Sequence, residues 1–189
     1  HKKHLMLNAR MGEFGGWDMP IQYTGILKEH EQTRTKCSIF DICHMGEIEV
    51  SGVSAITDLE RLLTCNINTI EVGQVKYAYL LNNEGGVIDD LTCYRLEDNK
   101  FMLVVNAATT NADLTWITEN ISSQTIITDR SSYYAKIDIQ GPLSKQVLTD
   151  LCDFNLNELK YFRFIKIDKI IVSRTGYTGE LGYELYIPF

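Results

Sequence analysis

The sequence predicts an α+β fold of short strands with interspersed helices. The segment 55–63 has apolar residues at the 3, 4, 7 spacing of a helix that faces a core. Two strand-like runs flank the turn residues 82–86, which indicates a hairpin. At 189 residues and 44% hydrophobic, the chain is long enough to bury a core as one large domain or as parts of two.

The remaining elements follow from the same patterns in chain order. Helices are predicted over 24–36, 55–63 and 110–121, with a shorter one after Gly141-Pro142. Strands are predicted over 47–50, 76–81, 87–94, 100–105, 133–139, 161–167, 170–175 and 182–187. Ser54 is the predicted N-cap of the second helix, and Thr110 with Asp113 has the spacing of a capping box at the third.

Charge and hydropathy exclude several classes of protein. The 18 Lys and Arg residues against 25 Asp and Glu give a net charge of −7, which opposes nonspecific attraction to nucleic acid or to an anionic membrane. No apolar run approaches the roughly 20 residues that span a bilayer, and no signal-peptide core follows the first residues. We therefore expect a soluble protein that is not exported. Because Phe189 ends a strand-like run without a polar tail, we also expect a piece cut within a domain.

The five cysteines are odd in number and scattered, without a Cys-x-x-Cys pair, so we expect reduced thiols and no metal. Cys43 beside His44 is a candidate nucleophile and base. Adjacent residues of a strand point to opposite faces, which opposes their direct pairing.

The segment 174–184 (RTGYTGELGYE) is the most informative part of the chain. Glycines allow close approach of the backbone to a ligand, while a tyrosine ring and a glutamate can hold a flat, nitrogen-rich heterocycle by stacking and paired hydrogen bonds. A glycine-rich turn with surface tyrosines is the alternative reading of the same residues.

Several further motifs occur in one register with this segment: 14–23 (FGGWDMPIQY), 40–47 (FDICHMGE), 82–91 (NNEGGVIDDL), 105–108 (VNAA) and 140–142 (QGP). Together they resemble the glycine cleavage system T-protein, a tetrahydrofolate-dependent aminomethyltransferase. The resemblance implies a T-protein-like folate-binding fold of mixed and antiparallel sheets with flanking helices, truncated before the C-terminal barrel. Residues 1–189 would then form an incomplete folate-binding region with parts of two interleaved lobes.

The resemblance places the catalytic acid at Asp89. Asp89 and Asp90 are adjacent on a predicted strand, so only one carboxylate can face a cleft. In the family, tetrahydrofolate takes the methylene of an aminomethyl group carried on the lipoyl arm of the H-protein, and ammonia leaves. A carboxylate beside the folate nitrogens can orient them and stabilise developing positive charge. From the residues alone, an Asp after a hairpin turn is more often solvated or bonded within the turn.

The resemblance also implies folate contacts, with no metal. Glu184 falls on the position that binds the donor-rich pterin edge, and the other contacts implied for the folate are Met45, Asn106, Tyr161 and Tyr177. Read singly, these are ordinary core, rim or turn residues. Leu181 stands where the family commonly has Asp or Asn, and Cys43 where Ser is usual. The Arg that holds the folate tail in the family lies outside these residues, so we expect the 189 residues alone to be inactive.

The expected partners are lipoylated H-protein and folate, in the cytoplasm of a bacterium or the mitochondrial matrix of a eukaryote. A folate-dependent demethylase and a noncatalytic folate-binding regulatory module remain as alternatives with the same resemblance. An iron–sulfur assembly protein is disfavoured because its cysteine-bearing signature is missing at 174–177, and the sarcosine and dimethylglycine dehydrogenases are disfavoured because no Gly-x-Gly-x-x-Gly fingerprint of a flavin domain occurs. A hydrolase that uses Asp89 and Glu180 is the alternative without the family.

Overall fold

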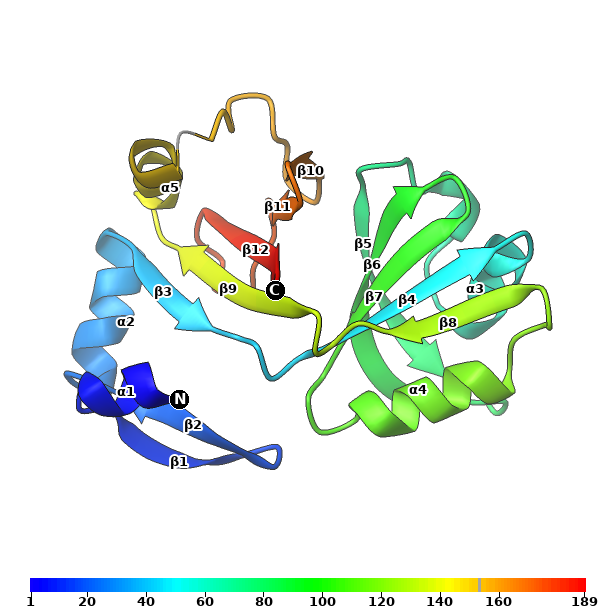
Figure 1. The fold of residues 1–189 in the computed structure, drawn as a ribbon, viewed down its shortest axis with the longest axis horizontal. Coiled ribbons are helices and arrows are strands. Elements are labelled where there is room, and N and C mark those ends of the chain that lie inside the picture. The colour runs from blue at the N-terminus through cyan, green and yellow to red at the C-terminus, as the bar shows by residue number, and fades with distance from the viewer. Residues whose placement is uncertain (153) are drawn as a thin grey trace.

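The computed structural model describes residues 1–152 and 154–189, and these residues form three antiparallel sheets connected by short helices (Figure 1). The first part of the chain is a two-stranded hairpin with one helix before it and one after it. These elements are α1 (Lys2–Met6), β1 (Arg10–Phe14), β2 (Trp17–Gln22) and α2 (Ile26–Thr35). The hairpin, which the sequence pattern did not predict, turns at Gly15 and Gly16, both with positive φ.

The central sheet has the strand order β5-β6-β7-β4-β8. Its elements, with the helices and 3₁₀ turn that cover it, are β4 (Gly46–Gly52), α3 (Ala55–Leu62), η1 (Ile67–Thr69), β5 (Val75–Leu81), β6 (Val87–Glu97), β7 (Lys100–Val105), α4 (Thr110–Glu119) and β8 (Thr125–Asp129). Leu59, Ile117 and Leu103 belong to the buried core between this sheet and helices α3 and α4. The predicted hairpin at 82–86 is confirmed.

The second five-stranded sheet has the order β10-β11-β12-β9-β3. Its elements are β3 (Ser38–Asp41), β9 (Tyr134–Gln140), α5 (Ser144–Cys152), β10 (Phe164–Ile167), β11 (Ile170–Ser173) and β12 (Gly182–Pro188). β3 precedes the whole central sheet in sequence but pairs with β9, which follows it. The chain therefore passes from one sheet to the other twice, as Figure 1 shows between β3 and β4 and between β8 and β9.

A separate core cluster joins the two five-stranded sheets. Tyr94 and Met102 of the central sheet pack with Phe164, Ile171 and Tyr186 of the second sheet. The ring centroids of Tyr94 and Tyr186 are 5.5 Å apart in an edge-on arrangement. The two five-stranded sheets are thus packed together through a buried aromatic contact.

Ser54 is the N-cap residue of α3, as predicted, but its hydroxyl donates to Gln124 Oε1 at 2.9 Å and makes no capping bond. The capping box predicted at α4 is wrong: Thr109 is the N-cap residue, and the Asp113 N–H donates to the Thr109 carbonyl. The Asp113 side chain is consequently free for another role.

The ends of several elements also differ from the sequence patterns. Strands β3 and β8 were not predicted, and the strand predicted over 161–167 begins only at Phe164 because Phe162 has a φ of 56°. Within the described residues, no helix has the length and apolar character needed to cross a membrane.

Candidate functional site

Asp89 is a nearly buried carboxylate, 7% exposed, on β6. Asn106 follows the last residue of β7 and donates to Asp89 twice, from its backbone N–H to Oδ2 at 3.0 Å and from Nδ2 to Oδ1 at 2.8 Å. The Thr109 hydroxyl, at the start of α4, donates to Oδ2 at 2.9 Å. The carboxylate is therefore fixed by three donors from the segment that joins β7 to α4.

These donors decide the charge of Asp89. Burial alone would raise the pKa of this carboxyl, but the hydrogen bonds from Asn106 and Thr109, together with one shared with Asp113, lower it below its ordinary value. Asp89 is thus an anion at neutral pH. It suits stabilisation of positive charge better than donation of a proton.

Asp90 lies in a different environment although it is the next residue. Its side chain is exposed, and it accepts hydrogen bonds from the Tyr77 hydroxyl at 2.9 Å and from Asn106 Nδ2 at 3.1 Å. The two carboxylates differ in burial, as the alternation of a strand requires.

Asp113 is a functional candidate that the sequence analysis missed. Its carboxyl is fully buried against Asp89, and no N–H or O–H group of the described residues donates to either of its oxygens. Burial and then the hydrogen bond and negative charge of Asp89 raise the pKa of Asp113 to about 7. Asp113 is therefore about half protonated near neutral pH, and its protonated form can donate to the Asp89 carboxylate. The sequence analysis missed the pairing of Asp113 with Asp89 because the spacing of Thr110 and Asp113 resembles a capping box.

Glu184 of β12 is the centre of a second polar group. Its Oε2 accepts hydrogen bonds from the Tyr94 hydroxyl at 2.9 Å and the Thr175 hydroxyl at 2.6 Å, and its Oε1 lies 3.6 Å from Lys136 Nζ. Burial raises the pKa of Glu184, but Lys136 and the hydroxyl donors outweigh it and hold the pKa below its ordinary value. Oε1 is the oxygen that these hydroxyl donors leave free for a ligand.

Met45 is linked to this second group. Its sulfur lies 3.6 Å from Lys136 Nζ, and its side chain packs against the aromatic cluster between the sheets. The structure thus connects Met45 to Glu184 through Lys136. Asn106 belongs to the Asp89 group instead.

The two predicted tyrosines are exposed. The Tyr177 ring packs edge-on against Phe40 of β3, with centroids 6.1 Å apart. Because β3 pairs with β9, this contact places Tyr177 beside the second sheet. The Tyr161 ring packs edge-on against Phe162, with centroids 4.7 Å apart, and this pair is separate from that of Tyr177 and Phe40.

The glycines of 174–184 approach the protein's own Gln140. A Cβ atom at Gly176 or Gly182 would collide with the Gln140 side chain, which is fully buried and donates to the Thr175 carbonyl at 3.2 Å. Gly176 also has a φ of 155°. At Gly176 and Gly182, the close approach that the sequence led us to expect with a ligand is instead made with Gln140. This internal contact fixes the loop beside Glu184.

Two alternative sites are not assembled. The Cys43 thiol lies against the backbone of Lys136, at 3.4 Å from its carbonyl, and burial followed by Asp41 raises its pKa to about 11, so it is not a thiolate nucleophile. Glu180 forms an ion pair with Arg34 of α2 at 3.0 Å. It lies in the loop before β12, whereas Asp89 lies in the central sheet, and no hydrogen bond among the described residues joins the two.

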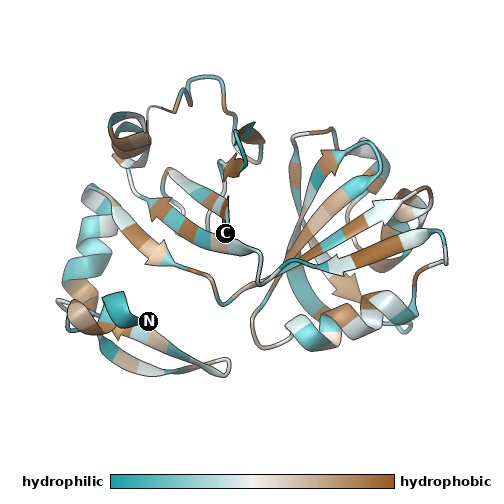
Figure 2. Ribbon diagram, viewed as in Figure 1, coloured by the Kyte–Doolittle hydropathy of each residue, from teal (hydrophilic) through white to brown (hydrophobic). Residues whose placement is uncertain are grey.

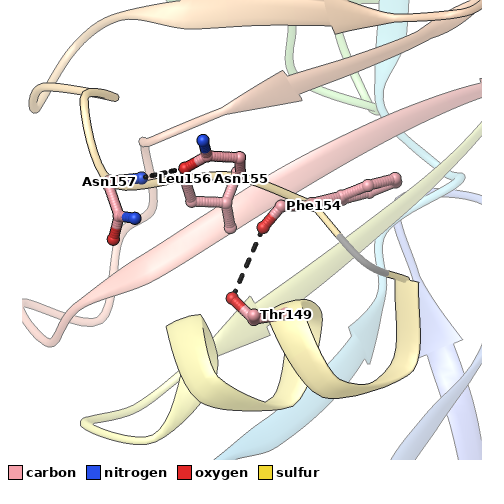
Figure 3. Close-up of a pocket in the computed structure, with 5 residues that line it drawn as sticks. All are labelled: Thr149, Phe154, Asn155, Leu156 and Asn157. Carbon is pink, nitrogen blue, oxygen red and sulfur yellow. Dashed lines mark hydrogen bonds between the residues drawn. The ribbon is translucent and has the colours of Figure 1, made fainter.

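Neither of two clefts found among the described residues is lined by the whole set of predicted residues. A cleft of about 340 Å³ lies between the N-terminal hairpin, the segment before β4 and the start of α4, and Met45 is the predicted residue that lines it. A smaller cavity of about 170 Å³ lies between Thr149 of α5 and the segment 154–157 (Figure 3). The side chains drawn there carry no charge and include none of the predicted residues.

The chain belongs to the family described as the GCVT N-terminal domain, which it matches over residues 1–189. It is 43% identical over 188 residues to an aminomethyltransferase of Halothermothrix orenii. This match covers 97% of this chain and 53% of that protein. It is 39% identical over 193 residues to an aminomethyltransferase of Listeria monocytogenes, covering all of this chain and 53% of that protein. The chain therefore spans about half the length of the curated relatives it matches.

Solved structures show the same fold. The glycine cleavage system aminomethyltransferase T from Bartonella henselae superposes with a TM-score of 0.93 at 35% identity, over 99% of this chain and 52% of that one. A heterotetrameric sarcosine oxidase from a Corynebacterium species superposes with a TM-score of 0.61 at 14% identity, over 86% of this chain and 82% of that one. The second likeness concerns the fold alone. The predicted fold class and family are both confirmed.

Proposed function

We propose that the whole protein is the aminomethyltransferase of the glycine cleavage system, which transfers the methylene of the aminomethyl-lipoyl H-protein to tetrahydrofolate and releases ammonia. The observation that carries the proposal is Asp89, a buried anion held by Asn106 and Thr109 in a member of this family. Glycine breakdown is then the process that this protein serves.

Asp89 acts on charge rather than as an acid. A folate nitrogen becomes positive as it attacks the methylene carbon while the amine departs, and a fixed carboxylate stabilises that charge without reorganisation. Because the donors of Asn106 and Thr109 are already in place, the carboxylate does not have to move when the substrate binds. The low pKa of Asp89 keeps this charge available at neutral pH.

We further propose that Glu184 receives the N–H donors of the pterin ring, with Tyr177 covering its face. Met45 and Tyr161 would supply apolar and aromatic walls, and Asn106 would contact folate beside Asp89. Glu184 supports this role because Lys136 and the hydroxyl donors keep it ionised, which strengthens its hydrogen bonds to a ligand.

Residues 1–189 would form an incomplete folate-binding region, with parts of two interleaved lobes, and would bind folate weakly and catalyse nothing alone. The proposal is consistent with the share of its relatives that the chain spans. We place the whole protein in the cytoplasm if its source is bacterial and in the mitochondrial matrix if it is eukaryotic.

The direct test is product formation by the whole protein supplied with aminomethylated H-protein and tetrahydrofolate. Methylenetetrahydrofolate and ammonia in equal amounts are the expected products. Methyl transfer from a sulfonium compound, without reaction of H-protein, would contradict the proposal and indicate a demethylase. Folate binding without either reaction would indicate a noncatalytic module.

A further inference from the structure

The polar side of β9 is buried, which reverses the usual pattern of a surface strand. Lys136, Asp138 and Gln140 alternate with Ile137 and Ile139, as the bands of Figure 2 show along this strand. The three polar residues are at most 2% exposed, whereas the two isoleucines are only partly buried. The polar row therefore faces the interior of the protein.

Asp138 is the unexplained member of this row. Gln140 is bonded to the loop before β12, and Lys136 lies beside Glu184. Asp138 is fully buried, and neither of its carboxyl oxygens receives an N–H or O–H donor from the described residues. An ionised carboxylate without donors is too costly to keep in such a place.

The partner of Asp138 is Glu184. The two residues are directly opposite in the antiparallel pairing of β9 with β12. Two carboxylates at opposed positions repel each other, and one proton between them converts that repulsion into a hydrogen bond. Glu184 already has hydroxyl donors and Lys136, so it is the member that stays ionised.

The surrounding charges agree with this assignment. Burial, followed by the charge of Glu184, raises the pKa of Asp138 well above its ordinary value, although Lys136 acts in the opposite direction. Glu47 of β4 is also buried, and burial raises its pKa to about 8 against the opposing charge of Lys136, with smaller raising effects from Asp129 and Glu184. The titratable groups around the pair are Lys136, Glu47, Tyr94, Tyr177 and Tyr186.

We propose that Asp138 is a protonated positioning residue whose carboxyl group donates a hydrogen bond to Glu184 and holds that carboxylate in place to accept the donors of the pterin ring. The proposal rests on the role given to Glu184 above. It adds a residue that the family resemblance did not indicate.

The proposal makes ligand affinity depend on pH. At neutral pH the pair holds one proton and one negative charge. When Asp138 ionises at higher pH, its hydrogen bond to Glu184 is lost and the two carboxylates repel each other. Affinity for folate should then fall as the pH rises through the pKa of Asp138.

The proton itself is tested without any folate. In the whole protein labelled with ¹³C at aspartate carboxyls, Asp138 should remain protonated at neutral pH, with Asp138→Asn identifying its signal. Glu184→Gln should lower its pKa, because the like charge is removed. An Asp138 that titrates in the ordinary range of aspartate, or whose pKa does not change in Glu184→Gln, would overturn the proposal.

The positioning role is tested by tetrahydrofolate affinity. Asp138→Asn keeps a side-chain donor toward Glu184 and should bind within a few-fold of the parent, without the loss of affinity at high pH. Asp138→Ala removes the donor and should weaken binding by about tenfold or more. Asp150→Asn makes the same chemical change at an exposed position of α5 and is the matched control.

Equal affinity of Asp138→Ala and the parent would overturn the positioning role, as would equal weakening in Asp138→Asn and Asp138→Ala. If the parent protein fails to bind tetrahydrofolate, the proposed function fails. The carboxyl titration would still decide whether Asp138 and Glu184 share a proton.

Discussion

Asn106 binds the Asp89 carboxylate through both its backbone and its side chain, at 3.0 and 2.8 Å. The two bonds fix both carboxylate oxygens, because each donor contacts a different one. Thr109, the N-cap residue of α4, adds a third donor. The end of β7 and the start of α4 therefore set the position and the charge of Asp89.

Asn106→Ala should raise the pKa of Asp89, because it removes the side-chain donor that stabilises the anion while burial persists. The acid limb of the turnover–pH profile of the whole enzyme should then move to higher pH. Asn111→Ala, at an exposed position of α4, is the control. An acid limb at the same pH in Asn106→Ala and the parent would show that this bond does not set the charge of Asp89.

Asp113→Asn and Asp113→Leu should behave differently. The amide keeps an N–H donor toward Asp89, whereas leucine leaves a carboxylate with one donor fewer. We expect Asp113→Asn to retain most turnover and to lose a titration near pH 7, since the pKa of Asp113 is raised to about 7. Asp113→Leu should lose about tenfold or more. Similar turnover and pH profiles in both variants would contradict the shared proton.

Glu47→Gln should make stability less dependent on pH. The folded-state pKa of Glu47 is raised from 4.5 to about 8, so its neutral form is favoured by folding. This contribution is complete below pH 4.5 and is lost as the pH rises through about 8. Urea midpoints measured between these pH values should fall more in the parent than in Glu47→Gln. The exposed Glu119→Gln should follow the parent, and parallel midpoints in all three proteins would refute the prediction.

Glu184→Gln should weaken tetrahydrofolate binding by about 1–3 kcal/mol, the cost of leaving donors to a charged group unsatisfied. The amide offers one acceptor oxygen where the carboxylate offers two, and Tyr94 and Thr175 already use one. Calorimetric titration of the whole protein measures the change. Unchanged affinity would remove Glu184 from the folate site.

Elements with strong local sequence patterns could be predicted, whereas pairings between distant segments could not. The helix at 55–62 and the hairpin around 82–86 have strong local patterns, so the sequence predicted them. The pairing of β3 with β9 joins residues about 100 positions apart and leaves no local pattern. The strand over 133–139 was predicted, but its alternation does not show which side is buried: its polar residues face inward and its isoleucines are the more exposed side.

Some residues of the candidate site were predicted from the sequence, and others were found only in the structure. Asp89, Asn106 and Glu184 were named through motifs, and the structure places Asn106 on Asp89. Asp113 and Asp138 were missed because each looks ordinary in sequence: one has the spacing of a helix cap, and the other alternates like a solvated strand residue. Their carboxyls become functional candidates only because folding buries each one beside a second carboxylate, which raises its pKa.

The most direct test of the central claim compares Asp89→Asn with Asp90→Asn in the whole protein, which places the same change on the buried and the exposed member of one pair. Single-turnover rates with aminomethylated H-protein and separate tetrahydrofolate affinities should be measured for both. Asp89→Asn should reduce the rate by about 100-fold or more while affinity changes by a few-fold, because its charge acts mainly in the transition state. Asp90→Asn should retain the parental rate. Equal rates in Asp89→Asn and the parent would contradict the assignment of Asp89 as the catalytic residue.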